Sequence, residues 1–193
     1  MKVIAIEHNW DEHYCPPSVA GHLMADSAIM HTDRPFFIPD VTPRLVGRLA
    51  VAMRIGRLGK FVASKFAHRY CNEFTAAIVA TAENDEERAR QPLVEAIDGG
   101  LMLGEWITDD RVAERLNHAQ FTMMCNGTTI CRAETRRLAF DAATVVESVS
   151  RFCTLKTGDI IVLAMHPGGL PLAIGQRLHA AVDDKTVLDI RVR

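Results

Sequence analysis

The sequence lacks the features that mark several protein classes. No cluster of Lys and Arg residues suggests nucleic-acid binding, and no apolar run comes near the roughly 20 residues that span a membrane. The opening segment, MKVIAIEHNW, has neither the long apolar region nor the small-residue cleavage site of a signal peptide. These absences predict a cytoplasmic protein that binds neither nucleic acid nor a membrane.

Cysteine is scarce, and the cysteine count is odd. The chain has five cysteines, which fits free thiols in a reducing compartment better than a set of disulfides. Cys125 and Cys131 flank a predicted hairpin but have no nearby His or Cys partners for a four-ligand zinc site. No metal site is predicted from the cysteines.

The overall composition is that of an ordinary globular protein. Hydrophobic residues make up 48% of the chain, and the formal net charge is −2. A chain of 193 residues is long enough to bury a sizeable core and short enough for one domain. Residues 1–193 are therefore predicted to form a single domain.

The clearest local pattern lies between Phe121 and Pro171. Asn126-Gly127 separates two short β-type runs, which predicts a hairpin. Asp141 is predicted to be the N-cap residue of the helix that follows. The apolar stripe of this helix is then expected at Val145, Val149 and Phe152.

Further elements are expected on both sides of this region. A loop is predicted over residues 15–25, an edge strand over 34–40, and a short helix over 62–70. The patterns predict strands at 3–6, 45–55 and 160–163, and a closing hairpin with arms 176–182 and 186–192.

The order of hairpin, helix, turn, strand and glycine-rich bend resembles the C-terminal part of the fumarylacetoacetate hydrolase family, in particular its short bacterial members. RPFFIPD, KFAHRYCNEF, LGEWI and SRFCTLKTGDII carry the resemblance, which spans residues 2–193. It implies a mixed, mainly-β (α+β) fold, a β-roll or β-sandwich with few short helices, chiefly near 62–71 and 142–153. It also implies a homodimer.

The resemblance places the family's metal ligands on residues of a different kind. The two glutamates of its Glu-x-Glu pair fall on Arg48 and Ala50, and its metal-binding aspartate falls on Val79. A guanidinium and a methyl group cannot hold an oxygen-ligated dication. No cofactor is therefore expected here, although the family uses Mg²⁺ or Mn²⁺. The acidic run 83–87 is open to two interpretations, a replacement metal cluster or the solvated start of a helix.

Other site positions also differ from the family pattern. The family's active-site lysine falls on Glu95. His13 matches its catalytic histidine, but Pro16 stands where the orienting glutamate would be. Thr135 is kept, and His166 lies in the segment that replaces the substrate-binding turn. Arg48 and Glu95 would then have exchanged charges, which predicts a salt bridge between them, or one from Arg48 to the run 83–87.

Three functions stay open. The first is a catalytically degenerate homologue with a structural or regulatory role. In the second, Arg44 or Arg48 binds a substrate carboxylate and His13 or His166 moves a proton. The third is the family's metal-assisted hydrolysis, isomerisation or decarboxylation of small oxo-acids, such as acylpyruvates, oxaloacetate or 2-hydroxyhepta-2,4-diene-1,7-dioate. A small carboxylate is the expected ligand.

Overall fold

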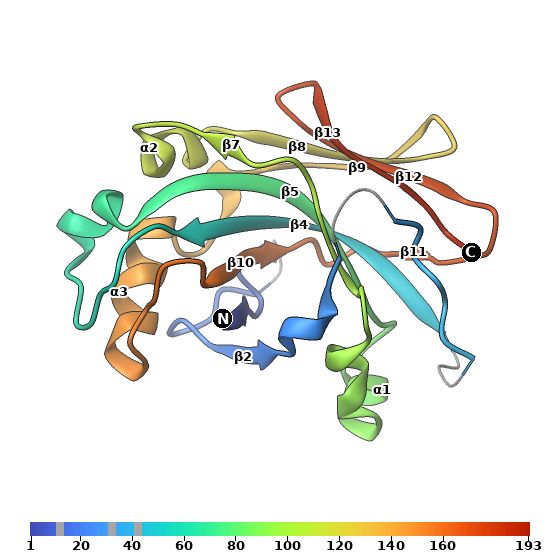
Figure 1. The fold of residues 1–193 in the computed structure, drawn as a ribbon, viewed down its shortest axis with the longest axis horizontal. Coiled ribbons are helices and arrows are strands. Elements are labelled where there is room, and N and C mark those ends of the chain that lie inside the picture. Colours follow the sequence, from blue (N-terminus) through green and yellow to red (C-terminus); the bar gives the residue numbers. More distant parts are fainter. Residues whose placement is uncertain (11–13, 31–33, 41–43) are drawn as a thin grey trace.

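The computed structural model of the chain describes residues 1–10, 14–30, 34–40 and 44–193. Its backbone is organised around two β-sheets, and the strands of the two sheets can be followed in Figure 1. The strands are β1 (Val3–Ile6), β2 (Gly21–Met24), β3 (Ile29–Met30), β4 (Leu45–Ile55), β5 (Cys71–Ala82), β6 (Leu101–Leu103), β7 (Ile107–Thr108), β8 (Gln120–Cys125), β9 (Thr128–Glu134), β10 (Ile160–Met165), β11 (Leu170–Pro171), β12 (Arg177–Val182) and β13 (Lys185–Arg191).

The larger sheet has the strand order β2-β1-β10-β4-β5-β6-β3, with β11 paired to β4 and β7 paired to β5. The smaller sheet has the order β13-β12-β8-β9. The helices are short: α1 (Asp85–Arg90), α2 (Val112–Leu116), α3 (Ala142–Phe152), and the 3-10 helices η1 (Asp26–Ala28), η2 (Ser64–Arg69), η3 (Pro92–Ala96) and η4 (Thr135–Arg137). The predicted mainly-β fold with few short helices is confirmed.

The two longest strands, β4 and β5, pair with each other along their length and curve together through the middle of the molecule (Figure 1). Their side chains alternate between two buried faces. Leu49 and Val51 enter the larger core, which is shared with the smaller sheet and α3, whereas Ala50 and Ala52 enter a second apolar layer on the opposite face. Burial on both faces explains the nearly continuous apolar sequence of β4.

Helix α3 begins as predicted but buries less than predicted. The Asp141 carboxylate accepts a hydrogen bond from the Thr144 N–H at 2.8 Å, and Val145 and Val149 are buried. Phe152, by contrast, is 85% exposed. It is the last residue of α3 and lies beyond the part of the helix that packs on the core.

Both predicted hairpins are confirmed. Asn126 and Gly127 have φ angles of 49° and 81°, the left-handed pair that a tight two-residue hairpin needs. In the closing hairpin the same role falls to Asp183 and Asp184, with φ angles of 47° and 67°. Asp tolerates this conformation better than most residues.

Three local predictions need correction. Residues 15–25 are not all loop, because β2 pairs antiparallel with β1. The expected edge strand at 34–40 is reduced to one bridge, from Phe36 to Val192, although its backbone does bond to the chain end beside β13. The helix expected over 62–70 is the 3-10 helix η2. Short polar or proline-bounded segments carry too little periodicity to fix such details.

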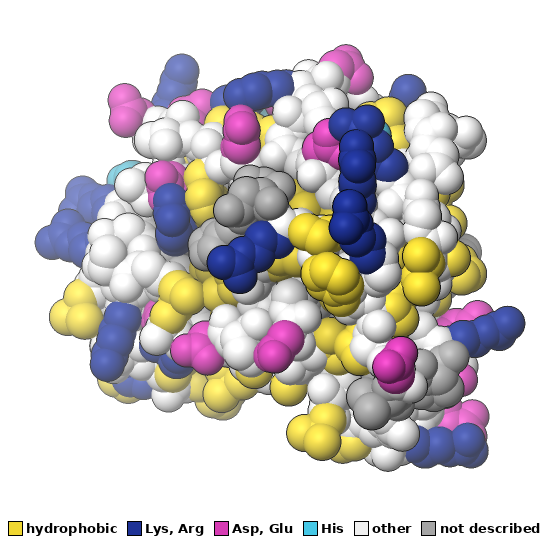
Figure 2. All heavy atoms as spheres, turned by 45° about the vertical axis from the view of Figure 1, so that its right-hand side comes forward, with side chains coloured by type: hydrophobic (Ala, Val, Ile, Leu, Met, Phe, Trp, Pro, Cys, Tyr) yellow, Lys and Arg dark blue, Asp and Glu magenta, His cyan; other side chains and the backbone are white. Residues whose placement is uncertain are grey.

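The acidic run 83–87 lies at the start of helix α1, which agrees with one of the two interpretations given to it above. The Asn84 side chain caps α1 by accepting from the Glu87 N–H at 2.9 Å. On the face that Figure 2 turns forward, Lys and Arg side chains are interspersed with acidic and apolar ones. Within the described ranges, the helices are too short and too polar to cross a bilayer.

Candidate functional site

A cavity of about 300 Å³ opens at the ends of three strands of the larger sheet. Since β1 and β10 are parallel neighbours, the residues that follow them reach the same edge of the sheet. The cavity wall includes Glu7 and His8 after β1, Arg48 of β4, Thr81 of β5, Arg88 of α1, and His166 after β10.

The three positions that the resemblance assigned to metal ligands lie side by side. Arg48 of β4 pairs directly with Val79 of β5, and Ala50 pairs with Ala77. Ala50 and Val79 are fully buried in the second apolar layer, whereas Arg48 reaches the cavity wall. Of these three residues, only Arg48 lines the cavity.

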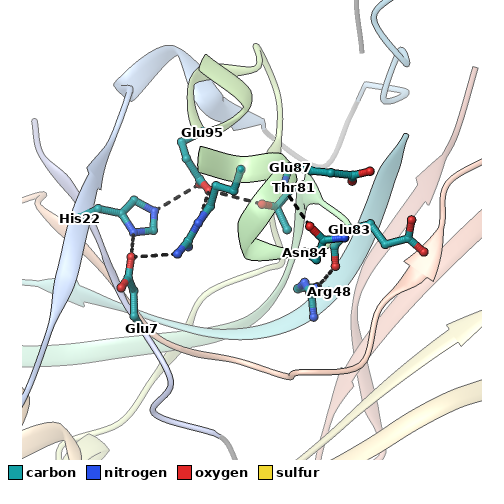
Figure 3. Close-up of polar contacts among 9 residues, drawn as sticks. Glu7, His22, Arg48, Thr81, Glu83, Asn84, Glu87 and Glu95 are labelled. Atoms are coloured by element: carbon teal, nitrogen blue, oxygen red, sulfur yellow. Dashed lines mark hydrogen bonds and ion pairs between the residues drawn. The ribbon is translucent and has the colours of Figure 1, made fainter. Parts of the chain in front are cut away.

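Main-chain oxygens hold Arg48 at this wall. Its Nη1 donates to the Pro167 carbonyl, and its Nη2 donates to the Glu83 carbonyl at 2.7 Å (Figure 3). The Glu83 carboxylate instead lies 3.5 Å from Arg44 Nη1. The acidic run therefore contacts Arg48 through the main-chain carbonyl of Glu83.

The predicted salt bridge between Arg48 and Glu95 is wrong. Glu95 of η3 is directed towards His22 of β2, and its Oε2 lies 3.2 Å from His22 Nε2 (Figure 3). Its Oε1 accepts from Thr81 Oγ1 at 3.3 Å and lies 4.0 Å from Arg88 Nε. The prediction missed His22 because the segment that forms β2 was expected to be a loop.

His22 lies between two carboxylates. Its Nδ1 is 2.9 Å from Glu7 Oε1, opposite the contact with Glu95, and Arg88 Nη2 is 3.4 Å from the same Glu7 oxygen. The hydrogen bond to Glu95 raises the pKa of His22, burial lowers it, and Glu7 adds to the rise, so that the pKa lies above its usual value. Burial disfavours ionised Glu95, but His22 and Arg88 outweigh it and hold the pKa of Glu95 below its usual range. With His22 protonated, this network of two cations and two anions is balanced.

His166, a predicted site residue, lines the cavity, and its ring is held by contacts with Gly168. Its Nδ1 lies 3.1 Å from the Gly168 nitrogen and 3.2 Å from the Gly168 oxygen. The neutral ring can accept from this N–H, and the protonated ring can donate to this carbonyl. His166 therefore stays oriented in both protonation states, with Nε2 available for other contacts.

Thr135, one of the predicted site residues, does not line the described cavity. Thr135 is buried, and its Oγ1 accepts from the Ala119 N–H at 3.0 Å and donates to the Ala119 carbonyl at 3.1 Å. Its side chain thus joins η4 to the segment before β8, and it does not line the cavity. His13 lies outside the described residues.

A second cavity, also of about 300 Å³, adjoins the first. Trp10, His166 and Pro167 contribute to the walls of both. Arg132 and Arg137 also line the second cavity, and neither was predicted to be a site residue. The basic segment RAETRR after the hairpin was the available signal.

The chain was compared with known proteins on this basis. Residues 7–184 match the sequence profile described as "Fumarylacetoacetate (FAA) hydrolase C-terminal". The chain belongs to this family. A mitochondrial oxaloacetate decarboxylase of Dictyostelium discoideum is 20% identical over 193 residues, which cover 94% of this chain and 88% of that protein.

Solved structures share the fold of this FAA hydrolase family protein. A 5-carboxymethyl-2-hydroxymuconate delta-isomerase from Mycobacterium smegmatis has a TM-score of 0.89 at 24% identity, covering 99% of this chain and 76% of that one. A fumarylpyruvate hydrolase from Pseudomonas aeruginosa, in complex with Mn²⁺ and pyruvate, has a TM-score of 0.88 at 18% identity, covering 100% of this chain and 89% of that one.

The Mn²⁺ in the fumarylpyruvate hydrolase corrects the expectation that no cofactor is involved, because a protein of this fold holds a divalent metal. The ligand set in this FAA hydrolase family protein does not resemble a metal centre. Arg48, Ala50 and Val79 offer no oxygen ligand, and within the described ranges no three His, Cys, Asp or Glu side chains are grouped to hold an ion. These residues therefore do not fit a divalent metal ion.

Proposed function

We propose that this FAA hydrolase family protein binds a small oxo-carboxylate in the cavity between Arg48 and His166. The observation that carries the proposal is the placement of these two side chains on the wall of one cavity of about 300 Å³. That volume lies at the lower end of the range for small-molecule sites. Nη1 and Nη2 of Arg48 each donate one N–H to a main-chain carbonyl, and the second N–H of each nitrogen can donate to a ligand carboxylate.

His166 complements Arg48 in this role. Its ring is oriented through Nδ1, which leaves Nε2 to donate to a keto or carboxylate oxygen of the ligand. The similarity to an oxaloacetate decarboxylase supports an oxo-acid as the ligand class. A proton-moving role for His166 is the enzymatic alternative, in which the protein acts on small oxo-acids as a hydrolase, isomerase or decarboxylase.

We further propose that binding exceeds turnover, so that the protein is a catalytically degenerate member of its family. Ala50 and Val79 replace reactive groups by inert ones, and Glu95 is held in an ion-paired network rather than directed at the ligand. His22, which could exchange protons, has a carboxylate on each ring nitrogen. These contacts stabilise the folded chain and leave His22 poorly placed to react.

Two measurements on one protein sample test both statements. Calorimetric titration with pyruvate and with 2-oxopentanoate measures binding. Turnover of acylpyruvates and oxaloacetate is assayed with and without added Mg²⁺ or Mn²⁺. Binding without turnover supports the proposal, and turnover under either condition supports the enzymatic alternative. A protein that binds neither oxo-acid contradicts the proposed function.

We also propose a symmetric homodimer, by analogy with the family and because two-fold pairs are the commonest closed assemblies. Light scattering at micromolar concentration measures the mass in solution. A monomeric mass would rule the dimer out.

A further inference from the structure

We infer that the second cavity is an anion subsite in which Arg132 selects oxo-acids that carry a second carboxylate. The inference rests on the proposed function, because it assigns the far end of a ligand whose oxo-carboxylate end lies between Arg48 and His166. The subsite lies at the end of β9, and Trp10 lines both this subsite and the cavity that holds Arg48.

The charge of Arg132 is the first argument. It is exposed on β9, and among the described residues it has no carboxylate partner. Glu134, the acidic residue of the same wall, is paired with Arg136. The carboxylate most able to neutralise Arg132 is thus already engaged elsewhere.

Two other arginines on the sheets are paired with carboxylates. Arg177 of β12 donates to both carboxylate oxygens of Asp189 on β13, at 2.9 and 2.6 Å. Arg54 of β4 pairs across the strands with Glu73 of β5. These two arginines have carboxylate partners on the neighbouring strand, whereas Arg132, beside a cavity, has none among the described residues. A carboxylate from a ligand would supply the missing anion.

The shared wall of the two cavities is the second argument. Trp10, His166 and Pro167 form walls of both, so His166 stands at their junction. Trp10 is buried, and its Nε1 donates to the Glu134 carbonyl at 3.1 Å, which fixes this shared wall to the end of β9. A short carbon chain passing His166 would have one anionic end near Arg48 and the other near Arg132.

Two ligands that differ only at the far end test the inference. 2-Oxoglutarate and 2-oxopentanoate have the same five-carbon chain and the same oxo-acid group, but only the former has a second carboxylate. Calorimetric titration of both is carried out with the wild-type protein, Arg132→Gln, and Arg111→Gln as control. Arg111 is exposed on the segment before α2 and does not line either cavity, so its substitution removes the same charge elsewhere.

The wild-type protein and Arg111→Gln should bind 2-oxoglutarate at least about tenfold more tightly than 2-oxopentanoate, since about 1.4 kcal/mol corresponds to a factor of ten. Arg132→Gln should lose this preference while keeping its affinity for 2-oxopentanoate. An equal affinity of the wild-type protein for both ligands would overturn the subsite. So would a preference that survives Arg132→Gln, or a loss that affects both ligands alike. If the wild-type protein does not bind 2-oxopentanoate or pyruvate at all, the proposed function itself fails.

Discussion

His22 Nε2 lies 3.2 Å from Glu95 Oε2, and this contact joins β2 to η3 across 73 residues of sequence. Both side chains are more than three-quarters buried, and Glu7 and Arg88 complete the network on the side of the first cavity. The contact replaces the predicted pairing of Glu95 with Arg48. It makes the charge of this region depend on a histidine, the side chain that titrates closest to neutral pH.

The stability of the protein should therefore depend on pH through this pair. The pKa of His22 is raised above 6.5 by folding, so its contribution is complete below that pH and is lost as the pH rises through the folded-state pKa. The pKa of Glu95 is lowered below 4.5, so its contribution is present above that pH and is lost as the pH falls through the folded-state pKa. The pair thus contributes most between these two values. Urea unfolding of wild-type protein and His22→Asn across this window and up to about pH 8 should show a larger loss for wild type on the alkaline side. Parallel curves would contradict this.

Mutational coupling should follow the observed contacts rather than the predicted salt bridge. Arg48→Leu and Glu95→Leu should have additive effects on the free energy of unfolding, because the two side chains do not pair. His22→Leu and Glu95→Leu should be non-additive by about 0.5–3 kcal/mol, the range for residues in direct contact. Urea unfolding of the three single and two double variants measures both couplings. Strong coupling between Arg48 and Glu95 would restore the original salt-bridge prediction.

Asp159 should be important for stability although it does not line either of these two cavities. It is buried, and its carboxylate accepts from the backbone N–H groups of Lys2 and Lys156, both at 2.8 Å. These bonds fix the start of β10 to the residue before β1. Asp159→Asn should cost about 1.5–3 kcal/mol, the range for hydrogen bonds to a charged group. Asp110→Asn, at an exposed position, serves as the control and should change the free energy of unfolding little.

Thr135→Val separates a structural role from the ligand-binding role that the resemblance implied. Loss of its two hydrogen bonds to Ala119 should destabilise the fold by about 1–3 kcal/mol, because buried polar groups are left without partners. The affinity for pyruvate should stay unchanged. Thr129→Val, on the exposed part of β9, should affect neither quantity. A weaker affinity for pyruvate in Thr135→Val would assign Thr135 to the site after all.

Local signals in the sequence were enough to predict much of the fold. The nearly continuous apolar run of β4, the turn residues Asn126 and Gly127, and the capping residue Asp141 are each signals within a few neighbouring residues. The family resemblance added the long-range part, since it placed Arg48 and Val79 at one site and the two residues are indeed cross-strand partners.

The polar contacts of the site could not be predicted in the same way. His22 lies on a four-residue strand with no periodic pattern, and its partners Glu7 and Glu95 are 15 and 73 residues away. Arg132 becomes a candidate binding residue only because the hydrogen bond from Trp10 to Glu134 holds the N-terminal segment against the end of β9. Such pairings depend on how distant segments pack, which neither hydrophobic periodicity nor turn signals specify.

The affinity of Arg48→Gln for pyruvate tests the proposed oxo-carboxylate site most directly. Arg54→Gln is the matched control, because Arg54 lies on the same face of β4 but contacts Glu73 and Trp106 instead of the cavity. Calorimetric titration should show pyruvate binding to wild type and Arg54→Gln, and at least about tenfold weaker binding to Arg48→Gln, equivalent to about 1.4 kcal/mol. Equal affinity of all three proteins, or no binding to the wild-type protein, would contradict the site.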